Sequence, residues 1–392
     1  MPHYPYLIIG GGMAADAAVK GIRQIDQAGQ IGIIGHEKNP PYKRPYLTKQ
    51  LWKGKPESSI WLHSAEVGAD MLMGRSACNI DTVSKRVVDD TGTQYSFDKL
   101  LIATGGTPRR LPFDSEDIIY FRTYDDYRNL RALTEQGDRF AVIGGGFIGW
   151  EIAAALTMNN KHATMIFPEN TIGARIYPKD LAQFLNSYYL EHGVEILSSD
   201  TAVDITKRGN KSIVNTKNGR TLEVDGVVAG IGITPNTDIA ESAGLHIDNG
   251  IIVDEFLRTN NPDIYSAGDV TNFFNPTLNK RTRVEHEDNA VIMGEYAGRI
   301  MAGDVAPYHH TPYFYSDLFD LGYEAVGEIN SSLDTIIDWK EPFQEGVVYY
   351  MKDSRVRGVL LWNVWEKVDT ARNLLAESGL FTADDLKGRI TG

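Results

Sequence analysis

Residues 140–149 read FAVIGGGFIG and residues 6–15 read YLIIGGGMAA, so one short pattern occurs twice in the chain. Each copy is an apolar run, then a glycine turn, then a stretch of helical character at residues 150–158 or 16–25. Short apolar runs bounded by glycine are typical of buried parallel strands, and a strand, glycine turn and helix open a βαβ unit. The two copies therefore predict two such units.

Two further strand-to-glycine turns support this division. Residues 99–106 read KLLIATGG, and residues 226–232 read GVVAGIG. Strands that alternate with helices predict an α/β fold with two doubly wound parallel sheets. From about residue 308 the pattern changes, because residues 347–351 and 357–362 predict an antiparallel hairpin and residues 367–378 predict a helix. We expect a small α+β domain at this end.

The repeated turn has the spacing that binds a pyrophosphate. The first glycine permits the turn, the second lets the backbone approach the phosphates, and the third small residue lets the helix pack on the strand. The helix N-terminus then offers free N–H groups to the phosphates. The matching residues are Gly10, Gly12 and Ala15 in the first copy and Gly144, Gly146 and Gly149 in the second.

An acidic residue at the end of the next strand completes each unit, because its carboxylate binds a ribose hydroxyl. Glu37 stands at this place in the first unit, and Glu169 stands there in the second. Two complete units predict two bound dinucleotides.

The amino-acid composition limits the classes of partner that the chain could bind. The formal net charge of -13 disfavours nucleic acid and anionic lipid. No apolar run approaches the roughly 20 residues of a membrane span, and the first strand begins almost at once, so we expect a cytoplasmic protein. The single cysteine, Cys78, excludes an intramolecular disulfide and a cysteine-based metal cluster. We expect Cys78 to be a packed small side chain, and we expect no metal site.

Residues 261–269, NPDIYSAGD, resemble the second FAD motif of the pyridine-nucleotide flavoprotein reductases. The resemblance implies a fold like that of glutathione reductase, in which Gly268 and Asp269 contact FAD and the aspartate holds its ribityl chain. It implies that residues 1–118 and 245–308 bind FAD and residues 119–244 bind NAD(P)H. Residues 309–392 would form the α+β interface domain.

Within this superfamily, residues 41–49, PYKRPYLTK, resemble a segment of the ferredoxin-reductase type. Residues 283–288, RVEHED, and 322–327, GYEAVG, are most similar to the apoptosis-inducing factors. We expect the chain to differ from those factors in two places, a long N-terminal targeting region and a long insertion between residues 339 and 347, neither of which has a counterpart in the residues that carry the resemblance. The resemblance therefore extends to the redox module only.

The resemblance also implies the roles of several side chains near the flavin. Lys49 would pair with Glu151, so that a fixed cation stabilises negative charge on the reduced flavin ring. The Glu151 carboxylate would keep that cation from being unpaired and would accept a hydrogen bond from the nicotinamide amide. Glu285 and His286 would line the flavin–nicotinamide interface, with His286 as a third catalytic candidate, and Tyr315 would face the ring. The alternatives are a solvated lysine, an exposed helix glutamate, a structural histidine and a packing tyrosine. The other expected cofactor contacts are Arg44, Ala103, Thr104 and Gly105 for FAD and Arg175 and Gly232 for the coenzyme.

Glu169 favours NADH as the coenzyme, because a carboxylate repels the 2′-phosphate of NADPH. Arg175 lies near enough in sequence to bind that phosphate, so NADPH stays open. Relatives that reduce disulfides or peroxide carry a cysteine where this chain has residues 42–49, which excludes a cysteine relay.

The remaining acceptors are an electron-carrier protein such as a ferredoxin or rubredoxin, a quinone, or oxygen. An acidic carrier would need a basic patch, for which the candidates are Lys43, Arg44, Lys53 and Lys55, or Arg281 and Arg283. The alternative function is a redox-sensing interaction protein like apoptosis-inducing factor. Such a protein would turn over slowly, keep a stable reduced flavin–NAD+ complex, and form a redox-dependent homodimer.

Overall fold

The computed structural model describes residues 1–113 and 115–391. By packing, the chain forms two compact units. Unit 1 comprises Met1–Arg44, Glu57–Thr107 and Thr234–Pro312, and unit 2 comprises Pro45–Pro56, Pro108–Ile233 and the residues from Tyr313 onward. Two of the boundaries between the units, after residue 107 and after residue 233, fall within short strands, β7 (Gly106–Pro108) and β16 (Ile233–Pro235). The three-domain division expected from the sequence stays a prediction.

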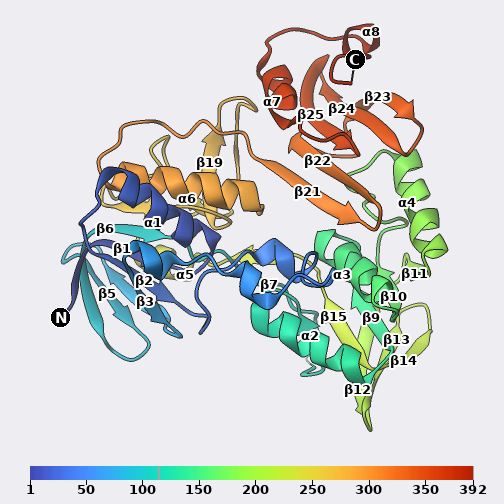
Figure 1. Cartoon of the computed structure of the whole chain (residues 1–392), viewed down its shortest axis with the longest axis horizontal. Coiled ribbons are helices and arrows are strands. Elements are labelled where there is room, and N and C mark those ends of the chain that lie inside the picture. Colours follow the sequence, from blue (N-terminus) through green and yellow to red (C-terminus); the bar gives the residue numbers. More distant parts are fainter. Residues whose placement is uncertain (114, 392) are drawn as a thin grey trace. The chain divides into compact units, whose positions relative to one another are not determined.

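Unit 1 is built on a mixed sheet with the strand order β3-β2-β1-β6-β5-β4, and β18 pairs with β6 (Figure 1). The parallel part comprises β1 (His3–Ile9), β2 (Ile31–Gly35), β3 (Ala69–Met73), β6 (Gln94–Ile102) and β18 (Ile264–Ser266). The antiparallel part adds β4 (Ala77–Asp81) and β5 (Arg86–Asp89). Both turns that follow β1 and β6 therefore lie at the same edge of the sheet.

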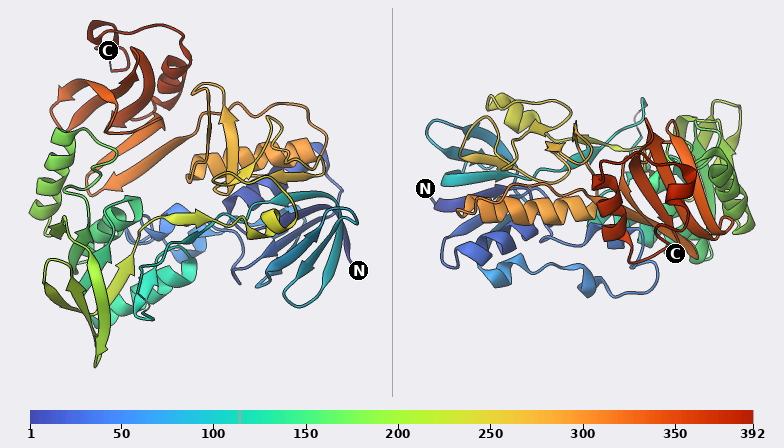
Figure 2. Two further views of the ribbon diagram at one scale, coloured as in Figure 1. Left: turned by 180° about the vertical axis from the view of Figure 1, so that it is seen from behind. Right: turned by 90° about the horizontal axis from the view of Figure 1, so that it is seen from above.

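Helices α1 (Met13–Ile25) and α6 (Glu287–Met301) lie side by side in both views of unit 1 (Figures 1 and 2). Their backbones are close, because a Cβ on Gly294 would lie 2.3 Å from the carbonyl oxygen of Ala14. A Cβ on Gly298 would lie 2.1 Å from that of Ala18. The remaining elements of unit 1 are η2 (Glu57–Ile60), η3 (Ser64–Val67), α5 (Asp238–Ser242), β17 (Ile251–Ile252), β19 (Thr271–Asn275) and β20 (Lys280–Thr282); η1 (Arg44–Leu47) begins in it.

The prediction that Cys78 is packed is wrong. Cys78 is exposed on β4. Ala77 pairs with Asp89 and Asn79 pairs with Val88, so the register shifts at Cys78. A bulge of this kind leaves the extra residue outside the ladder and re-aims its side chain, here toward solvent.

Unit 2 contains a parallel sheet in the order β11-β10-β9-β15-β8. Its strands are β8 (Ile118–Tyr120), β9 (Arg139–Ile143), β10 (His162–Phe167), β11 (Glu195–Ser198) and β15 (Gly226–Ala229). Its helices are α2 (Tyr124–Gln136), α3 (Phe147–Met158) and α4 (Lys179–Glu191). A separate antiparallel sheet follows, with β12 (Ala202–Arg208), β13 (Lys211–Thr216) and β14 (Thr221–Val224).

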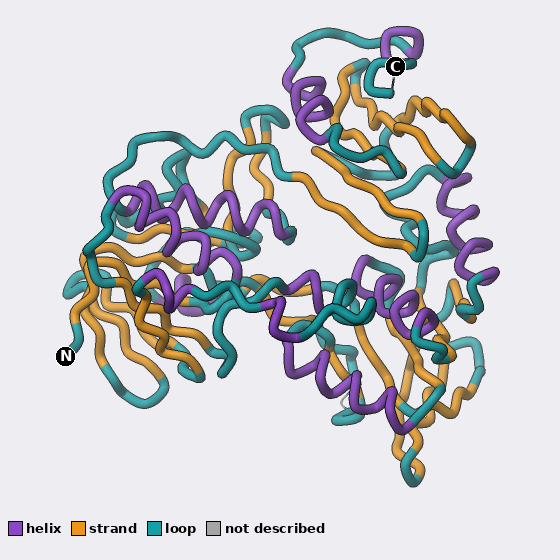
Figure 3. The backbone as a smooth tube through the Cα atoms, in the orientation of Figure 1, coloured by secondary structure: helices purple, strands orange, loops and turns teal. Residues whose placement is uncertain are grey.

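The C-terminal part of unit 2 is an antiparallel sheet in the order β21-β22-β25-β24-β23 (Figure 3). Its strands are β21 (Tyr313–Leu318), β22 (Leu321–Gly327), β23 (Asp334–Glu341), β24 (Glu345–Lys352) and β25 (Arg355–Trp362), followed by α7 (Val368–Ala376) and α8 (Ala383–Leu386). The predicted hairpin is β24–β25, and its two turn residues, Asp353 and Ser354, have φ of 52° and 58° as a tight hairpin requires. The predicted fold class is confirmed.

None of the described helices combines the length and the apolar character needed to cross a bilayer.

Candidate cofactor and redox site

The first glycine loop joins β1 to α1 in a conformation that suits a phosphate. Gly10 has a φ of +120°, and a Cβ there would lie 2.1 Å from the carbonyl oxygen of Ala103. At Gly12 an added Cβ would meet no atom within 4 Å. Gly12 is the N-cap residue of α1, and no side chain there accepts a hydrogen bond from the first N–H groups of the helix. Uncapped N–H groups beside open space form a ready anion site, so the residues present fit the pyrophosphate of a dinucleotide.

The second loop, between β9 and α3, repeats this geometry in unit 2. Gly144 has a φ of +118°, and Gly146 caps α3 with open space where its Cβ would be. The third positions differ, because a Cβ on Gly149 would lie 2.0 Å from the carbonyl oxygen of Gly144, whereas the first loop accommodates the Cβ of Ala15. The second loop also fits a pyrophosphate.

The carboxylates predicted to bind ribose follow β2 and β10, but their surroundings differ. Glu37 accepts from Arg44 Nη2 at 2.8 Å and from Tyr42 Oη at 2.6 Å, and Tyr42 Oη in turn accepts from Arg44 Nη1 at 2.8 Å. Burial lowers the pKa of the Arg44 guanidinium, but the interactions with Tyr42, Glu37 and Asp269 outweigh burial and raise this pKa above its usual range. Glu169 pairs with Arg175 Nη2 at 2.6 Å, and that arginine side chain is 82% exposed.

The other FAD residues predicted in unit 1 lie beside the first loop. A Cβ on Gly268 would lie 3.1 Å from Ala14 Cβ on α1. Thr104 follows β6, donates to the carbonyl oxygen of Asn236 at 2.8 Å, and is flanked by Ala103 and by Gly105 with a φ of 63°. The carbonyl oxygen of Asp269 accepts from Arg283 Nη1 at 3.0 Å. Gly268, after β18, and Ala103, after β6, therefore both lie beside the first loop and the start of α1.

Glu285 and His286 lie at the start of α6 in unit 1. Glu285 pairs with Arg283 at 2.7 Å, and His286 is the residue that caps α6. Their proposed contact with flavin or nicotinamide stays a prediction.

Lys49 and Glu151 form a buried ion pair within unit 2. Lys49 Nζ lies 2.7 Å from Glu151 Oε1, and the exposed fractions of the two side chains are 8% and 4%. Lys49 Nζ also lies 4.9 Å from the centroid of the Tyr315 ring. The sequence also allowed a solvated loop lysine and an exposed helix glutamate. The burial of both side chains excludes these two alternatives.

Three buried neighbours of Glu151 were missed by sequence reasoning. Thr48 Oγ1 donates to Glu151 Oε2 at 2.6 Å, and Ser316 Oγ donates to Glu151 Oε1 at 2.6 Å. Trp150 Nε1 donates to the same Ser316 oxygen at 2.9 Å. Only adjacency to Lys49, Glu151 and Tyr315 in the sequence could have pointed to them.

The phenols packed near Glu151 stay neutral. Burial raises the pKa of Tyr323 well above its usual range, and the negative charge of Glu151 adds to the shift. Tyr189 is raised by burial, by Tyr177 and by the same carboxylate, so its pKa also lies far above neutrality. Lys49 is the side chain that forms the ion pair with Glu151 in this cluster.

Most of the basic residues considered for a docking patch are engaged. Arg44 and Arg283 pair with Glu37 and Glu285, as described above. Arg281 donates to the carbonyl oxygens of Val253 and Asn272, and Lys53 pairs with Asp317 at 2.8 Å. Three of the six candidate residues, Arg44, Lys53 and Arg283, therefore have their charge balanced by a carboxylate.

The last predicted coenzyme contact, Gly232, has a φ of 93°, and its carbonyl oxygen accepts from the Arg109 amide at 2.9 Å. Within the described part of the chain, no group of three or more His, Cys, Asp or Glu side chains could hold a metal ion.

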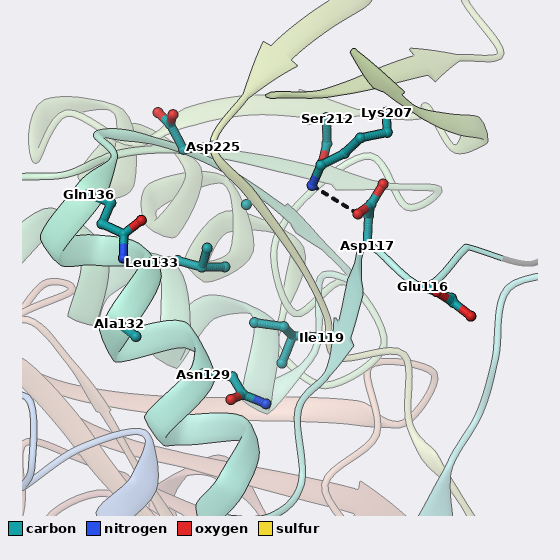
Figure 4. A pocket seen from close by; sticks show the side chains of 11 residues that line it. Glu116, Asp117, Ile119, Asn129, Ala132, Leu133, Gln136, Lys207, Ser212 and Asp225 are labelled. Carbon is teal, nitrogen blue, oxygen red and sulfur yellow. Dashed lines mark hydrogen bonds and ion pairs between the residues drawn. The ribbon is translucent and has the colours of Figure 1, made fainter. Parts of the chain in front are cut away.

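A pocket of about 320 Å³ lies elsewhere in unit 2, among α2, β8 and β13 (Figure 4). Asp117 and Asp225, at the amino ends of β8 and β15, line it, and Lys207 pairs with Asp117 across it at 2.9 Å. Dinucleotides bind at the carboxyl ends of such strands. None of the predicted site residues lines this pocket, and we assign it no part in cofactor binding.

Comparison with known families matches most of the chain. The model of the pyridine nucleotide-disulphide oxidoreductases matches residues 4–294. The C-terminal model of apoptosis-inducing factor, mitochondrion-associated, matches residues 297–342 and 338–377. The resemblances found in the sequence are thereby confirmed.

Individual relatives agree with these matches. Apoptosis-inducing factor 1, mitochondrial, from Dictyostelium discoideum is 34% identical over 95% of this chain and 78% of its own length. Monodehydroascorbate reductase 3 from Arabidopsis thaliana is 35% identical over 91% of this chain and 89% of its own length. Among solved structures, the ferredoxin reductase for the CYP199A2 system from Rhodopseudomonas palustris is 27% identical with a TM-score of 0.89, and the match covers 97% of this chain and 96% of that one.

Proposed function

The chain belongs to the pyridine nucleotide-disulphide oxidoreductase family, and on that premise we propose that it takes hydride from NADH and passes the electrons to a small acceptor that is not a disulfide. It is an FAD-dependent NAD(P)H oxidoreductase. The observation that carries the finer proposal is the buried pair of Lys49 and Glu151. Residues 42–49 contain no cysteine, and the single Cys78 is exposed on β4, which supports electron transfer without a disulfide relay.

The first loop would hold FAD and the second would hold the nicotinamide nucleotide. When bound, FAD supplies the two-electron acceptor for hydride and releases the electrons to the final oxidant. Gly10, Gly12, Glu37 and Asp269 would bind the FAD. Their counterparts for the coenzyme would be Gly144, Gly146 and Glu169, whose carboxylate favours NADH.

Lys49 would supply a positive charge for electron density that develops on the flavin. A cation that is already fixed needs no reorganisation during the reaction, and its effect is larger where water is excluded. Glu151 keeps the ammonium from being a buried unpaired charge. A carboxylate has about four acceptor positions, and Lys49, Ser316 and Thr48 fill three, so one is left for the amide of the nicotinamide.

A small acceptor is favoured over an acidic carrier protein by the charges of the chain. The net charge is -13, and the arginines of both candidate patches are paired or bonded to carbonyl groups. The similar monodehydroascorbate reductase is named for a small organic acceptor, whereas the similar ferredoxin reductase is named for a protein. A quinone and monodehydroascorbate are therefore the first acceptors to test, with a ferredoxin as the protein comparison.

The test is anaerobic stopped-flow reduction of the FAD-loaded protein by NADH and by NADPH, followed by mixing with each acceptor. Lys49→Met should slow reduction by NADH at least about tenfold, the effect of losing a fixed charge near the reacting centre. Lys53→Met is the matched control, because this lysine of the same segment pairs with the part-exposed Asp317 and should change little. Equal rates for Lys49→Met and the unaltered protein would reject the proposed role.

A second candidate function is a slowly reoxidised redox sensor, favoured by the match of residues 297–377 to the C-terminal model of apoptosis-inducing factor. The same experiment separates it from an enzyme with a fast acceptor. A long-wavelength absorbance band that persists in air, together with a change in sedimentation after NADH, would support the sensor. Rapid reoxidation by a quinone or monodehydroascorbate would support the enzyme.

A further inference from the structure

Glu151 is held by a hydrogen-bond chain that begins at the preceding residue of α3. Trp150 Nε1 donates to Ser316 Oγ at 2.9 Å, and Ser316 Oγ donates to Glu151 Oε1 at 2.6 Å. We propose that Trp150 is a positioning residue that fixes the Glu151 carboxylate through Ser316, a role that rests on the function proposed above for Glu151. Its indole would fix the direction of the Ser316 hydroxyl and thereby the orientation of the Lys49–Glu151 pair.

The direction of this chain follows from the chemistry of its members. An indole N–H can only donate, so Ser316 Oγ must accept from Trp150. The hydroxyl has a single hydrogen, and the carboxylate oxygen at 2.6 Å accepts it. Ser316 therefore cannot turn its hydrogen elsewhere without losing a short bond to a charged acceptor, which is stronger than a bond between neutral groups.

Burial makes each of these bonds consequential. Trp150 and Ser316 are fully buried, and Glu151 is nearly so. Water therefore cannot replace a lost partner at low cost, and an unsatisfied group keeps its full desolvation penalty. Removal of the indole donor leaves Ser316, Lys49 and Thr48 in contact with the carboxylate, but the indole then no longer fixes the direction of the Ser316 hydroxyl, which should loosen the carboxylate.

Trp150 also connects two elements that carry the site. Phe147, one turn earlier on α3, packs edge-on against Phe314 of β21, with ring centroids 5.6 Å apart. Trp150 packs against Phe147 at 4.9 Å and reaches Ser316 on the same strand. The aromatic contacts thus set α3 on β21, and the indole nitrogen adds the specific bond that aligns Glu151.

The experiment is a double-mutant cycle with Trp150→Phe and Ser316→Ala, in which Trp150→Phe removes the donor and keeps an aromatic ring. Each single variant should lower the limiting rate of flavin reduction by NADH about two- to tenfold, the value of one hydrogen bond. If Trp150 acts through Ser316, the double variant should be no slower than Ser316→Ala alone. A double variant whose loss equals the product of the two single losses would overturn the proposal.

Trp362→Phe is the matched control. This second fully buried tryptophan of unit 2 donates its Nε1–H to the carbonyl oxygen of Phe343 at 2.8 Å, and that bond is not part of the chain that ends at Glu151. Its replacement also removes one buried donor, so it should lower the thermal midpoint to a similar extent and leave the rate of flavin reduction unchanged. Equal rates for Trp150→Phe and Trp362→Phe would reject a specific role for Trp150.

A spectroscopic measurement tests the chain without turnover. The six tryptophans give indole ¹⁵N–¹H signals, and that of Trp150 is identified by its absence in Trp150→Phe. Glu151→Gln should shift this signal and leave that of Trp362 in place, and an unmoved Trp150 signal would overturn the chain. The proposed function fails separately if NADH reduces the flavin of Lys49→Met and Glu151→Gln as fast as that of the unaltered protein. A shifted indole signal would then show that the hydrogen-bond chain exists without that function.

Discussion

The two glycine loops have the same turn, but the helices that follow them carry different buried carboxylates. Asp16 of α1 binds Ser64 and pairs with Lys20, whose side chain is 47% exposed. Glu151 of α3 pairs with Lys49, which is nearly as buried as the glutamate itself. The turn thus fits a phosphate in both units, whereas only the second helix keeps a charge pair away from water. We infer that the loop sets which class of molecule binds, and the following helix sets what chemistry takes place there.

The largest expected difference comes from removing these two carboxylates. Glu151→Ala leaves the Lys49 ammonium buried without its partner, and a broken buried pair costs about 3–5 kcal/mol. Asp16→Ala loses a bond to Ser64 and a half-exposed ion pair, which together amount to about 1–2 kcal/mol. Denaturant unfolding of the FAD-loaded variants measures both. Equal losses would mean that the two helices do not differ in the way described here.

The third position of each loop gives the next prediction. Gly149→Ala would place a Cβ 2.0 Å from the carbonyl oxygen of Gly144, so the backbone must shift, at a cost of about 1–3 kcal/mol. Titration with NAD+ should show weaker binding by about tenfold, because 1.4 kcal/mol is a factor of ten. Ala15→Gly should cost about 1 kcal/mol through helix propensity alone and leave coenzyme affinity unchanged. Unaltered NAD+ affinity in Gly149→Ala would show that the second loop does not hold the coenzyme.

The sequence could predict these loops because their features are local. A strand, a positive-φ glycine and an uncapped helix start lie within ten residues, so spacing alone describes them. The pairing of the β24–β25 hairpin was equally local. Cys78 was misjudged because a bulge depends on the partner strand, and no neighbour in the sequence marks it.

The redox cluster was only partly within reach of the sequence. The pair of Lys49 and Glu151 came from a resemblance, since no periodicity connects residues so far apart. Ser316 and Thr48 gave no signal, because a hydroxyl looks the same in the sequence whether it meets solvent or a buried carboxylate. No feature of the sequence distinguishes Trp150 within its predicted helix, because its donor role requires knowledge of the strand that packs on it.

The two units can also be compared by the pKa of a buried aspartate at their antiparallel strands, because such a group makes stability depend on acid pH. Asp89 on β5 in unit 1 and Asp200 before β12 in unit 2 are both buried. Burial alone would raise the pKa of Asp89, but hydrogen bonds from Thr91, Arg75 and Tyr95 lower it below its usual value. The pKa of Asp200 is likewise lowered by its hydrogen bonds, against its burial.

A lowered folded-state pKa means that these carboxylates stabilise the protein above about pH 4, the unfolded value, and lose that contribution as the pH falls further. Asp89→Asn should therefore destabilise the protein at pH 7, and its deficit should shrink as the pH falls from about 4 toward 3. Thermal unfolding across this range measures the change. Asp200→Asn should behave in the same way, and a deficit that is constant with pH in both variants would contradict the shifts.

The smallest expected effect concerns the carboxylates that end the second strand of each unit. Glu37 is held by two donors, Arg44 and Tyr42, as suits a cofactor that stays bound, whereas Glu169 is held by one exposed arginine, as suits a coenzyme that exchanges. Arg175→Ala should change stability by less than about 1 kcal/mol, the value of an exposed ion pair. It should lower kcat/KM for NADPH by about two- to fivefold and leave that for NADH almost unchanged, because only NADPH offers a phosphate to the guanidinium. Steady-state rates with both coenzymes measure the ratio, and an equal loss with both would mean that Arg175 acts through Glu169 and not through that phosphate.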